Sequence, residues 1–411
     1  MTIPVLAGIV FGLFFITSCA QLGLTGSDST SAITSTSTPE EINRELARVN
    51  ERLSENPSDS VLQREKAVLL YTLAQNTDDP LLRKPYYRNL RELEESNEQQ
   101  GIQTHAGVER ILNRAWSTEQ GAGVELLQVN RNGATSEAVD LDRIRTHFEN
   151  AILLQPDSLS TYNLLANTHY LSGDLTSAIE VLNQALDVPG SDSPDIRERL
   201  AYLHLESGNI EQSILIYRDL TESYPEEEHL RHGLANALML SNDHDEAIAI
   251  LTDLAEEYET RYEYREALAV QLYYAFNTDV EELQENQNQE SDDAPSEEQL
   301  SELVDRAARF DDLISGLEEN LPLTEEQLYR NALIYLNSSE SFYDLSLITD
   351  ESRREGLQSL QSEFLQKAAP LLEKLVEDNP QNRDYARSLY NVYRDLGMND
   401  EADALERSYN L

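Results

Sequence analysis

The feature that most constrains this chain is a pattern that recurs between residues 159 and 258. Gly173, Gly208 and Asn242 occupy equivalent points in three consecutive copies, 35 and then 34 residues apart. Apolar residues on both sides of each point follow helical spacing, so each copy predicts two helices joined by a tight turn. Glycine takes the positive φ that ends a helix at no steric cost, and asparagine tolerates it. One such hairpin cannot bury both of its faces, so the copies must stack.

Each copy also pairs a small residue in its first helix with a small residue in its second helix. Short side chains at facing positions let two antiparallel helices approach closely. The three pairs are Ala166 with Ala178, Ala201 with Ser213, and Ala235 with Ala247.

The copies resemble the tetratricopeptide repeat, a helix–turn–helix unit of about 34 residues. The family's tryptophan at the first of eight matching positions is absent, and its glycine at the third is alanine in all three copies. The resemblance implies an all-α fold, a superhelical solenoid of antiparallel helix pairs with inserted loops. In the first copy the matching residues are Tyr162, Leu165, Ala166, His169, Gly173, Ala178, Leu182 and Ala185.

The rest of the chain is predicted to extend this array in both directions, with two interruptions. Residues 117–140 include Gly121, Gly123 and Gly133 and have no helical period, which favours a loop. Residues 277–298 are acidic, polar and poor in core-forming side chains, which favours disorder. The predicted organisation is a lipoprotein signal peptide at 1–18, a flexible Ser/Thr-rich tether at 19–39, degenerate N-terminal helical repeats at 40–140 with the loop at 117–140, regular tetratricopeptide repeats at 141–276, an acidic disordered insertion at 277–298, and degenerate C-terminal repeats with a cap at 299–411.

The N-terminal residues predict where the protein is located. Residues 3–16 form an apolar run, shorter than the roughly 20 residues that span a membrane, so a signal-peptide core is favoured. The run ends in Ile-Thr-Ser-Cys at 16–19, which resembles the bacterial lipobox and contains the only cysteine. The resemblance implies lipidation of Cys19, contact with the membrane through that lipid only, and a cell-envelope location. Ala20 favours the outer membrane, facing the periplasm. The alternative is an ordinary signal or short anchor with a cysteine there by chance.

Charge excludes some partners. The net charge is −45, because 76 acidic residues outnumber 31 basic ones. Binding to phosphates needs clustered Lys and Arg, so no nucleic acid is expected as a partner. A large acidic excess with few lysines is typical of halophilic adaptation, since salt screens self-repulsion. The alternative is that an acidic solenoid is simply soluble. The lysines are Lys66, Lys84, Lys367 and Lys374.

The sequence predicts no catalytic residue, no cofactor and no metal site. It lacks the P-loop, GxGxxG, HExxH, GxSxG and CxxC patterns. His169 and His204 share a repeat position that the family fills with a packed aromatic residue, so packing is the expected role. His229 and His232 lie three residues apart on one predicted helix, but no third metal ligand is identifiable. The chain is therefore predicted not to be an enzyme.

Binding is the remaining class of function. In tetratricopeptide-repeat proteins the first helix of each unit lines a concave groove, and the resemblance transfers those positions to this chain. It implies an apolar and aromatic stripe beside an acidic edge, which suits a protein or peptide with a basic or apolar face. The alternative is that a chain terminus or the next superhelical turn buries the stripe. The predicted groove residues are Asn163, Asn167, Tyr170, Glu198, Tyr202, Leu205, His232, Asn236, Met239, Glu266, Val270 and Tyr273.

Together these features predict a non-catalytic, lipid-anchored scaffold or adaptor of the cell envelope that binds proteins through its repeat groove. A second hypothesis is a subunit of an envelope assembly, pilus or secretion machine. A third is a surface glycan-binding lipoprotein. Sugars usually stack on tryptophan, and Trp116 is the only one in the chain, which counts against the third hypothesis.

Overall fold

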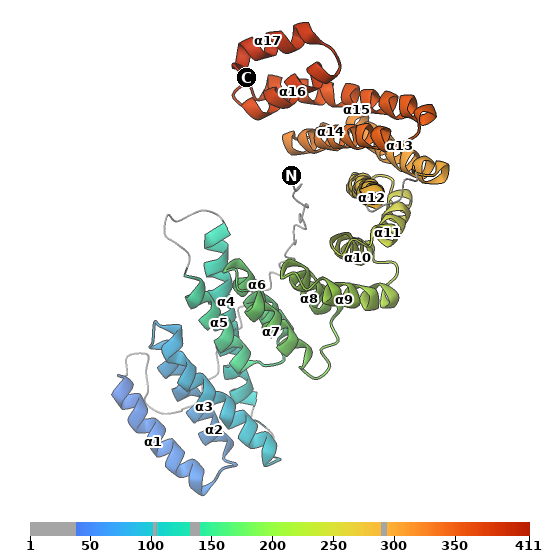
Figure 1. The fold of residues 1–411 in the computed structure, drawn as a ribbon. Helices are drawn as coiled ribbons and strands as arrows, with labels where there is room; N and C mark the ends of the chain where they lie inside the picture. Colours follow the sequence, from blue (N-terminus) through green and yellow to red (C-terminus); the bar gives the residue numbers. More distant parts are fainter. Residues whose placement is uncertain (1–37, 102–103, 105, 132–139, 289–293) are drawn as a thin grey trace. The chain divides into compact units, whose positions relative to one another are not determined.

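The fold is all-α, as the sequence predicts. The computed structural model describes residues 38–101, 104, 106–131, 140–288 and 294–411. These residues form seventeen helices and no strand (Figure 1). The chain divides into two compact units, whose described parts are 38–216 and 217–411. They are called the N-terminal unit and the C-terminal unit below.

The N-terminal unit contains α1 (Pro39–Glu55), α2 (Ser60–Gln75), α3 (Pro80–Gln99), α4 (Ala106–Arg131), α5 (Leu141–Leu154), α6 (Leu159–Leu171), α7 (Leu175–Leu186) and α8 (Pro194–Glu206). The division between the units falls inside α9 (Ile210–Ser223). The C-terminal unit continues with α10 (Glu228–Leu240), α11 (His244–Glu257), α12 (Tyr262–Asn288), α13 (Glu297–Asn320), α14 (Glu325–Ile348), α15 (Glu351–Asp378), α16 (Arg383–Asp395) and α17 (Asn399–Tyr409).

The three central copies form the helix pairs α6–α7, α8–α9 and α10–α11, with the predicted turns. Gly173, Gly208 and Asn242 have φ of 78°, 80° and 61°. After each turn residue, the next backbone N–H donates to a carbonyl five residues earlier, which closes the end of the first helix. These bonds join residue 174 to 169 (3.0 Å), 209 to 204 (2.8 Å) and 243 to 238 (3.0 Å). All six predicted small residues are buried.

Each unit has its own apolar core. In the N-terminal unit, one cluster joins α4 to α8 and includes Phe148 and Leu182, and others lie under α1 to α5. In the C-terminal unit, four phenylalanines from α12 to α15 contact one another with ring centroids 5.2–5.9 Å apart. The core is thus spread along the array of helices, as expected for stacked repeats.

The predicted loop at 117–140 is wrong over its first part, because α4 continues unbroken to Arg131. Glu119, Gly123 and Leu127 keep the helical spacing of buried positions through this stretch. Gly123 does not break the helix but lets it approach α5: a Cβ there would lie 2.6 Å from Cε1 of Phe148. Gly123 thus marks a close helix contact. Residues 132–139 lie outside the described part of the chain.

The predicted disordered insertion at 277–298 is also wrong over its first part, because α12 extends to Asn288. Val280 is 2% exposed and joins the core of the C-terminal unit. Gln284 donates a hydrogen bond from Nε2 to Oδ2 of Asp344 on α14, at 3.1 Å. Polar composition was misleading here because the polar residues have partners on the next repeat. Residues 289–293 lie outside the described part, and α13 begins at Glu297.

The lipidation site Cys19 and the tether at 19–37 also lie outside the described residues. Within the described ranges, no helix combines the length and the apolar character needed to cross a bilayer.

Candidate functional site

The predicted groove residues of the N-terminal unit lie on α6 and α8, the first helices of two adjacent repeats. Tyr170 on α6 and Tyr202 on α8 meet, with hydroxyl oxygens 3.1 Å apart and ring centroids 6.1 Å apart. Burial, followed by the hydrogen bond with Tyr170, raises the pKa of the Tyr202 hydroxyl. Both side chains remain half-buried, so they combine a shared contact with surface that a ligand can reach.

Four other predicted residues accompany this pair: Asn163 and Asn167 on α6, and Glu198 and Leu205 on α8. All four are half-buried. Oδ1 of Asn163 has lost contact with water and accepts no hydrogen bond within the described structure. We call these six residues, including Tyr170 and Tyr202, the first-helix face. It offers amide, carboxylate, hydroxyl and apolar groups side by side, which is the mixture that binds peptides.

In the C-terminal unit, the predicted residues His232, Asn236 and Met239 on α10 are half-buried. The His232 ring meets the edge of Tyr264 on α12 at a centroid distance of 5.2 Å. Burial lowers the pKa of His232, so the ring is neutral at neutral pH. Met239 packs against the apolar core, which leaves less of it for a ligand.

The predicted residues on α12 contact α14 or the apolar core: Glu266 and Val270 are half-buried, and Tyr273 is buried. Glu266 forms an ion pair with the buried Arg330 and accepts a hydrogen bond from Gln327 at 3.1 Å. Tyr273 is only 3% exposed, and Nδ2 of Asn337 donates to its hydroxyl oxygen at 2.8 Å. Val270 packs against the same core. Tyr273 is therefore buried against the next repeat, while Glu266 contacts the next repeat and keeps 22% of its side chain exposed.

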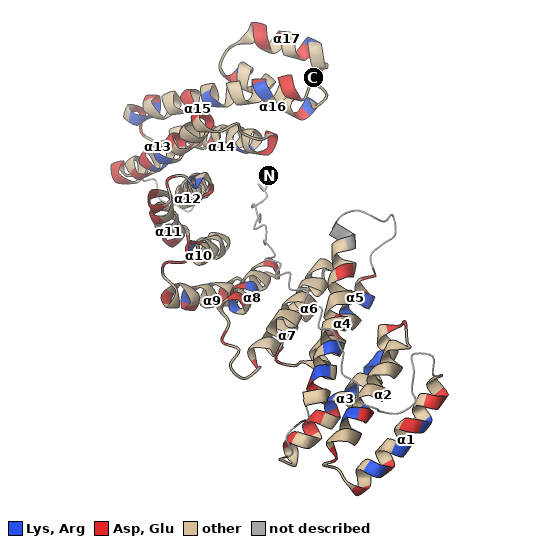
Figure 2. Cartoon of the chain, turned by 180° about the vertical axis from the view of Figure 1, so that it is seen from behind, with Lys and Arg blue, Asp and Glu red and all other residues tan. Residues whose placement is uncertain are grey.

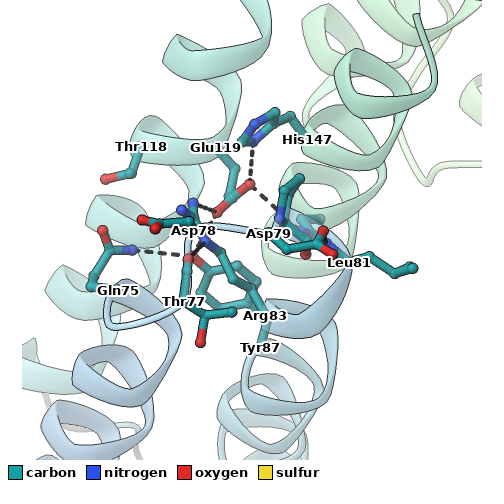
Figure 3. Close-up of polar contacts among 12 residues, drawn as sticks. Gln75, Thr77, Asp78, Asp79, Leu81, Arg83, Tyr87, Thr118, Glu119 and His147 are labelled. Carbon is teal, nitrogen blue, oxygen red and sulfur yellow. Dashed lines mark hydrogen bonds and ion pairs between the residues drawn. The ribbon is translucent and has the colours of Figure 1, made fainter. Parts of the chain in front are cut away.

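A second polar site, which the sequence did not predict, surrounds Glu119 of α4 (Figure 3). Its carboxylate has no exposed surface. Oε1 accepts hydrogen bonds from Nη1 of Arg83 at 2.9 Å and from the Tyr87 hydroxyl at 2.7 Å. Oε2 accepts from Nδ1 of His147 at 2.6 Å and from Nδ2 of Asn150 at 3.5 Å. Three helices, α3, α4 and α5, thus meet at one carboxylate.

The network also holds the connection between α2 and α3. Nε of Arg83 donates to the carbonyl of Thr77 at 2.7 Å, and Gln75 donates to the Tyr87 hydroxyl at 3.2 Å (Figure 3). Burial by itself would raise the pKa of Glu119, but the hydrogen bonds from His147, Tyr87 and Arg83 outweigh it and hold that pKa below its usual value. The carboxylate is therefore ionised and fully paired.

The arrangement around Glu119 suits a structural role better than catalysis. A carboxylate without exposed surface cannot meet a substrate, and its acceptor positions are taken by the protein's own donors. A signal for it exists in the sequence, because Val108, Leu112, Ala115 and Glu119 share helical spacing. A charged residue at a core-facing position implies buried partners. The glycines at 121, 123 and 133 obscure this signal, because they suggest a loop.

Comparisons with known proteins locate the repeat. A family model described as the tetratricopeptide repeat matches residues 159–191, and another of the same description matches 204–270. The first segment contains Asn163, Asn167 and Tyr170 of the first-helix face and the second contains Leu205, whereas Glu198 and Tyr202 lie between the two segments. No curated protein matches the chain.

Several solved structures are similar at low identity. A tetratricopeptide repeat protein from Parabacteroides merdae is 14% identical with a TM-score of 0.39, over 67% of this chain and 98% of that one. PilF of Pseudomonas aeruginosa is 12% identical with a TM-score of 0.37, over 66% and 99%. YrrB, described as having an unusual peptide-binding site, is 15% identical with a TM-score of 0.32, over 47% and 84%. At these values the likenesses carry no argument.

The fold of this family is typically a scaffold for protein–protein interaction and not a catalyst. The matched segments include α6–α7, α9 and α10–α11, with the turn residues Gly173, Gly208 and Asn242 at positive φ. Residues 159–191 and 204–270 of this all-α chain are therefore tetratricopeptide repeats.

Proposed function

We propose that this protein is a non-catalytic scaffold or adaptor that binds a protein or peptide at the first-helix face. The observation that carries the proposal is the Tyr170–Tyr202 pair, which bridges two adjacent first helices and remains half exposed. Tyrosines bound to each other are held in fixed positions, so a ligand that stacks on them does not have to order them. Asn163, Asn167 and Glu198 supply hydrogen-bonding groups beside the aromatic pair.

The ligand has a basic or apolar face. Glu198 lies beside the tyrosines, and acidic bands far outnumber basic ones along the helices (Figure 2). A partner with exposed acidic groups would be repelled by this charge, while basic groups would be attracted and held in register. An extended or helical peptide with alternating apolar and basic residues has the required chemistry.

The first-helix face can be tested by giving it positive charge, the same sign as the basic groups of the proposed ligand. The double variant Asn167→Arg with Leu205→Arg adds two cations to adjacent first helices, so capture of partners from membranes should fall on the order of tenfold or more. The measurement is a quantitative cross-linked pull-down at high salt. The matched control is Asn183→Arg with Leu215→Arg, which makes the same chemical changes at exposed positions of α7 and α9. Equal capture by the two double variants would rule the face out.

We further propose that the scaffold is anchored in the cell envelope through a lipid on Cys19, facing the periplasm. Several acyl chains are needed for stable anchoring, which a lipidated N-terminus supplies. Changing Cys19→Ala should move the protein from the membrane fraction to the soluble fraction. Persistent membrane association of that variant would contradict a lipid anchor.

A place in an envelope assembly, pilus or secretion machine is a narrower form of the same proposal. A stoichiometric complex that survives purification would favour it over a transient adaptor. The glycan-binding alternative loses support, because Trp116 is half-buried and its Nε1–H donates to Thr161 at 3.2 Å. A tryptophan held in this way has less free face for a sugar ring.

A further inference from the structure

The N-terminal unit contains a cleft away from the first-helix face, with a volume of about 620 Å³. The second half of α3, the start of α4, the connection between α5 and α6, and the turn after α7 form its walls. Leu112, Leu154 and Val188 supply apolar lining, and the first two are almost fully buried. This floor is made of residues that also belong to the repeat core.

The polar lining of the cleft is strongly acidic. Arg91 is its only basic residue, and it already pairs with Glu94 and, at 3.2 Å, with Glu95. Burial raises the pKa of Glu94, and the like charges of Glu98 and Glu109 raise it further against the opposing effect of Arg91. The cleft therefore holds more negative charge than its own residues neutralise. The lining carboxylates are Glu94, Glu98, Glu109, Asp157 and Asp187.

Tyr162 on α6 points independently to a ligand. It lines the cleft, is only 7% exposed, and its hydroxyl makes no hydrogen bond within the described structure. Burial raises the pKa of Tyr162, and the nearby Asp157 carboxylate adds to the effect, which places the hydroxyl beside the acidic rim. The hydroxyl oxygen keeps some contact with solvent although the side chain is more than nine-tenths buried, so it is free to hydrogen-bond to a molecule in the cleft.

The arrangement suits an organic cation better than a metal ion. Nowhere in the described ranges do three or more Asp, Glu, His or Cys side chains converge so that they could hold a metal. The cleft carboxylates are instead distributed around an apolar floor. Lysine and arginine side chains have a matching build, because an aliphatic stem packs on apolar surface while the charged head reaches polar groups. Arginine in particular presents several donors to separate acceptors.

We propose that this cleft binds a basic side chain, arginine or lysine, of a partner peptide. The aliphatic stem lies on Leu112, Leu154 and Val188, and the charged head is held by Glu98, Glu109 and the hydroxyl of Tyr162. The cleft is a second binding site, distinct from the first-helix face. It gives the scaffold a specific contact for the basic class of partner.

The test measures binding of a capped Gly-Arg-Gly peptide by calorimetry, with its neutral citrulline analogue for comparison. Glu98→Gln with Glu109→Gln removes two rim charges and leaves the Arg91–Glu94 pair intact, so affinity should fall on the order of tenfold. Tyr162→Phe, which keeps the packing, should also weaken binding. The control is Glu51→Gln with Glu55→Gln, which removes the same charge from exposed positions of α1 and should change affinity little.

Several results would overturn the proposal. They are equal binding by the rim variant and the α1 control, equal binding of the arginine and citrulline peptides, or no binding by the wild type. Binding of spermine distinguishes a peptide ligand from a small polyamine. If the rim variant loses spermine binding but keeps peptide binding, the ligand of the cleft is a polyamine and the proposal is wrong. The variant Asn167→Arg with Leu205→Arg should bind the tripeptide normally, so failure of the first-helix face and failure of the cleft are distinguishable.

Discussion

Replacing Glu119 with alanine is expected to lower the free energy of unfolding of the N-terminal unit by about 3–5 kcal/mol. The change leaves Arg83, whose side chain is 13% exposed, without its counter-charge, and removes the acceptor for Tyr87 and His147. Trp116 is the only tryptophan and lies on α4, so its fluorescence during urea unfolding reports on this unit. The loss should appear as a lower urea midpoint, and Glu119→Gln should fall between alanine and wild type.

The matched control is Glu149→Ala on α5. Glu149 pairs with Lys84 of α3 at 2.9 Å, but 43% of its side chain and 35% of the lysine side chain are exposed. An exposed ion pair contributes about 0–1 kcal/mol. The Arg83–Glu119 pair joins α3 to α4, and the Lys84–Glu149 pair joins α3 to α5. The main difference between the two pairs is therefore their burial. Similar losses for the two alanine variants would show that the Glu119 network is not a buried anchor.

The same variant should have a distinct pH profile. The folded-state pKa of Glu119 lies below its usual value, so the unfolded state binds more protons in that range, and stability falls as the pH drops below about 4.3. Glu119→Ala lacks this loss. A separate loss begins near pH 6.5 in both proteins, because burial lowers the pKa of several histidines and their protonation favours unfolding. These histidines are His169, His204, His232 and His244.

Local pattern was enough to predict the repeat but not the partners between repeats. Gly173, Gly208 and Asn242 revealed the helix pairs because a turn that requires positive φ restricts the residue at one position. The repeat position of Glu266 predicts a groove residue, because it corresponds to a groove position of the family. Its partner Arg330, 64 residues away on α14, follows from packing that no local spacing contains.

Glycine was the other source of error, because the same residue can end a helix or bring two helices together. Gly173 ends α6 with φ of 78°, whereas Gly123 lies inside α4 with the ring of Phe148 against it. Sequence alone does not distinguish the two, since the difference lies in a residue on another helix. In the C-terminal unit Gly233 repeats the second case, because a Cβ there would lie 2.3 Å from Cε1 of Tyr217.

This difference predicts opposite effects for two alanine substitutions on α4. Gly123→Ala should cost about 1–3 kcal/mol, because the new Cβ would overlap Phe148, whose ring is fully buried and cannot swing aside. Gly121→Ala meets open space and should stabilise the unit by about 0.5–1 kcal/mol, since alanine loses less backbone entropy in a helix. Both changes are measured by urea unfolding with Trp116 fluorescence.

A double variant identifies the cause of the Gly123 effect. Phe148→Leu removes the ring that the new Cβ meets, so adding it to Gly123→Ala should cost less than the sum of the two single changes. If the losses simply add, the ring is not the obstacle and the close approach of α4 to α5 has another basis. If Gly123→Ala and Gly121→Ala change stability by the same amount, the result would contradict a continuous helix over residues 117–131 that packs one face against α5.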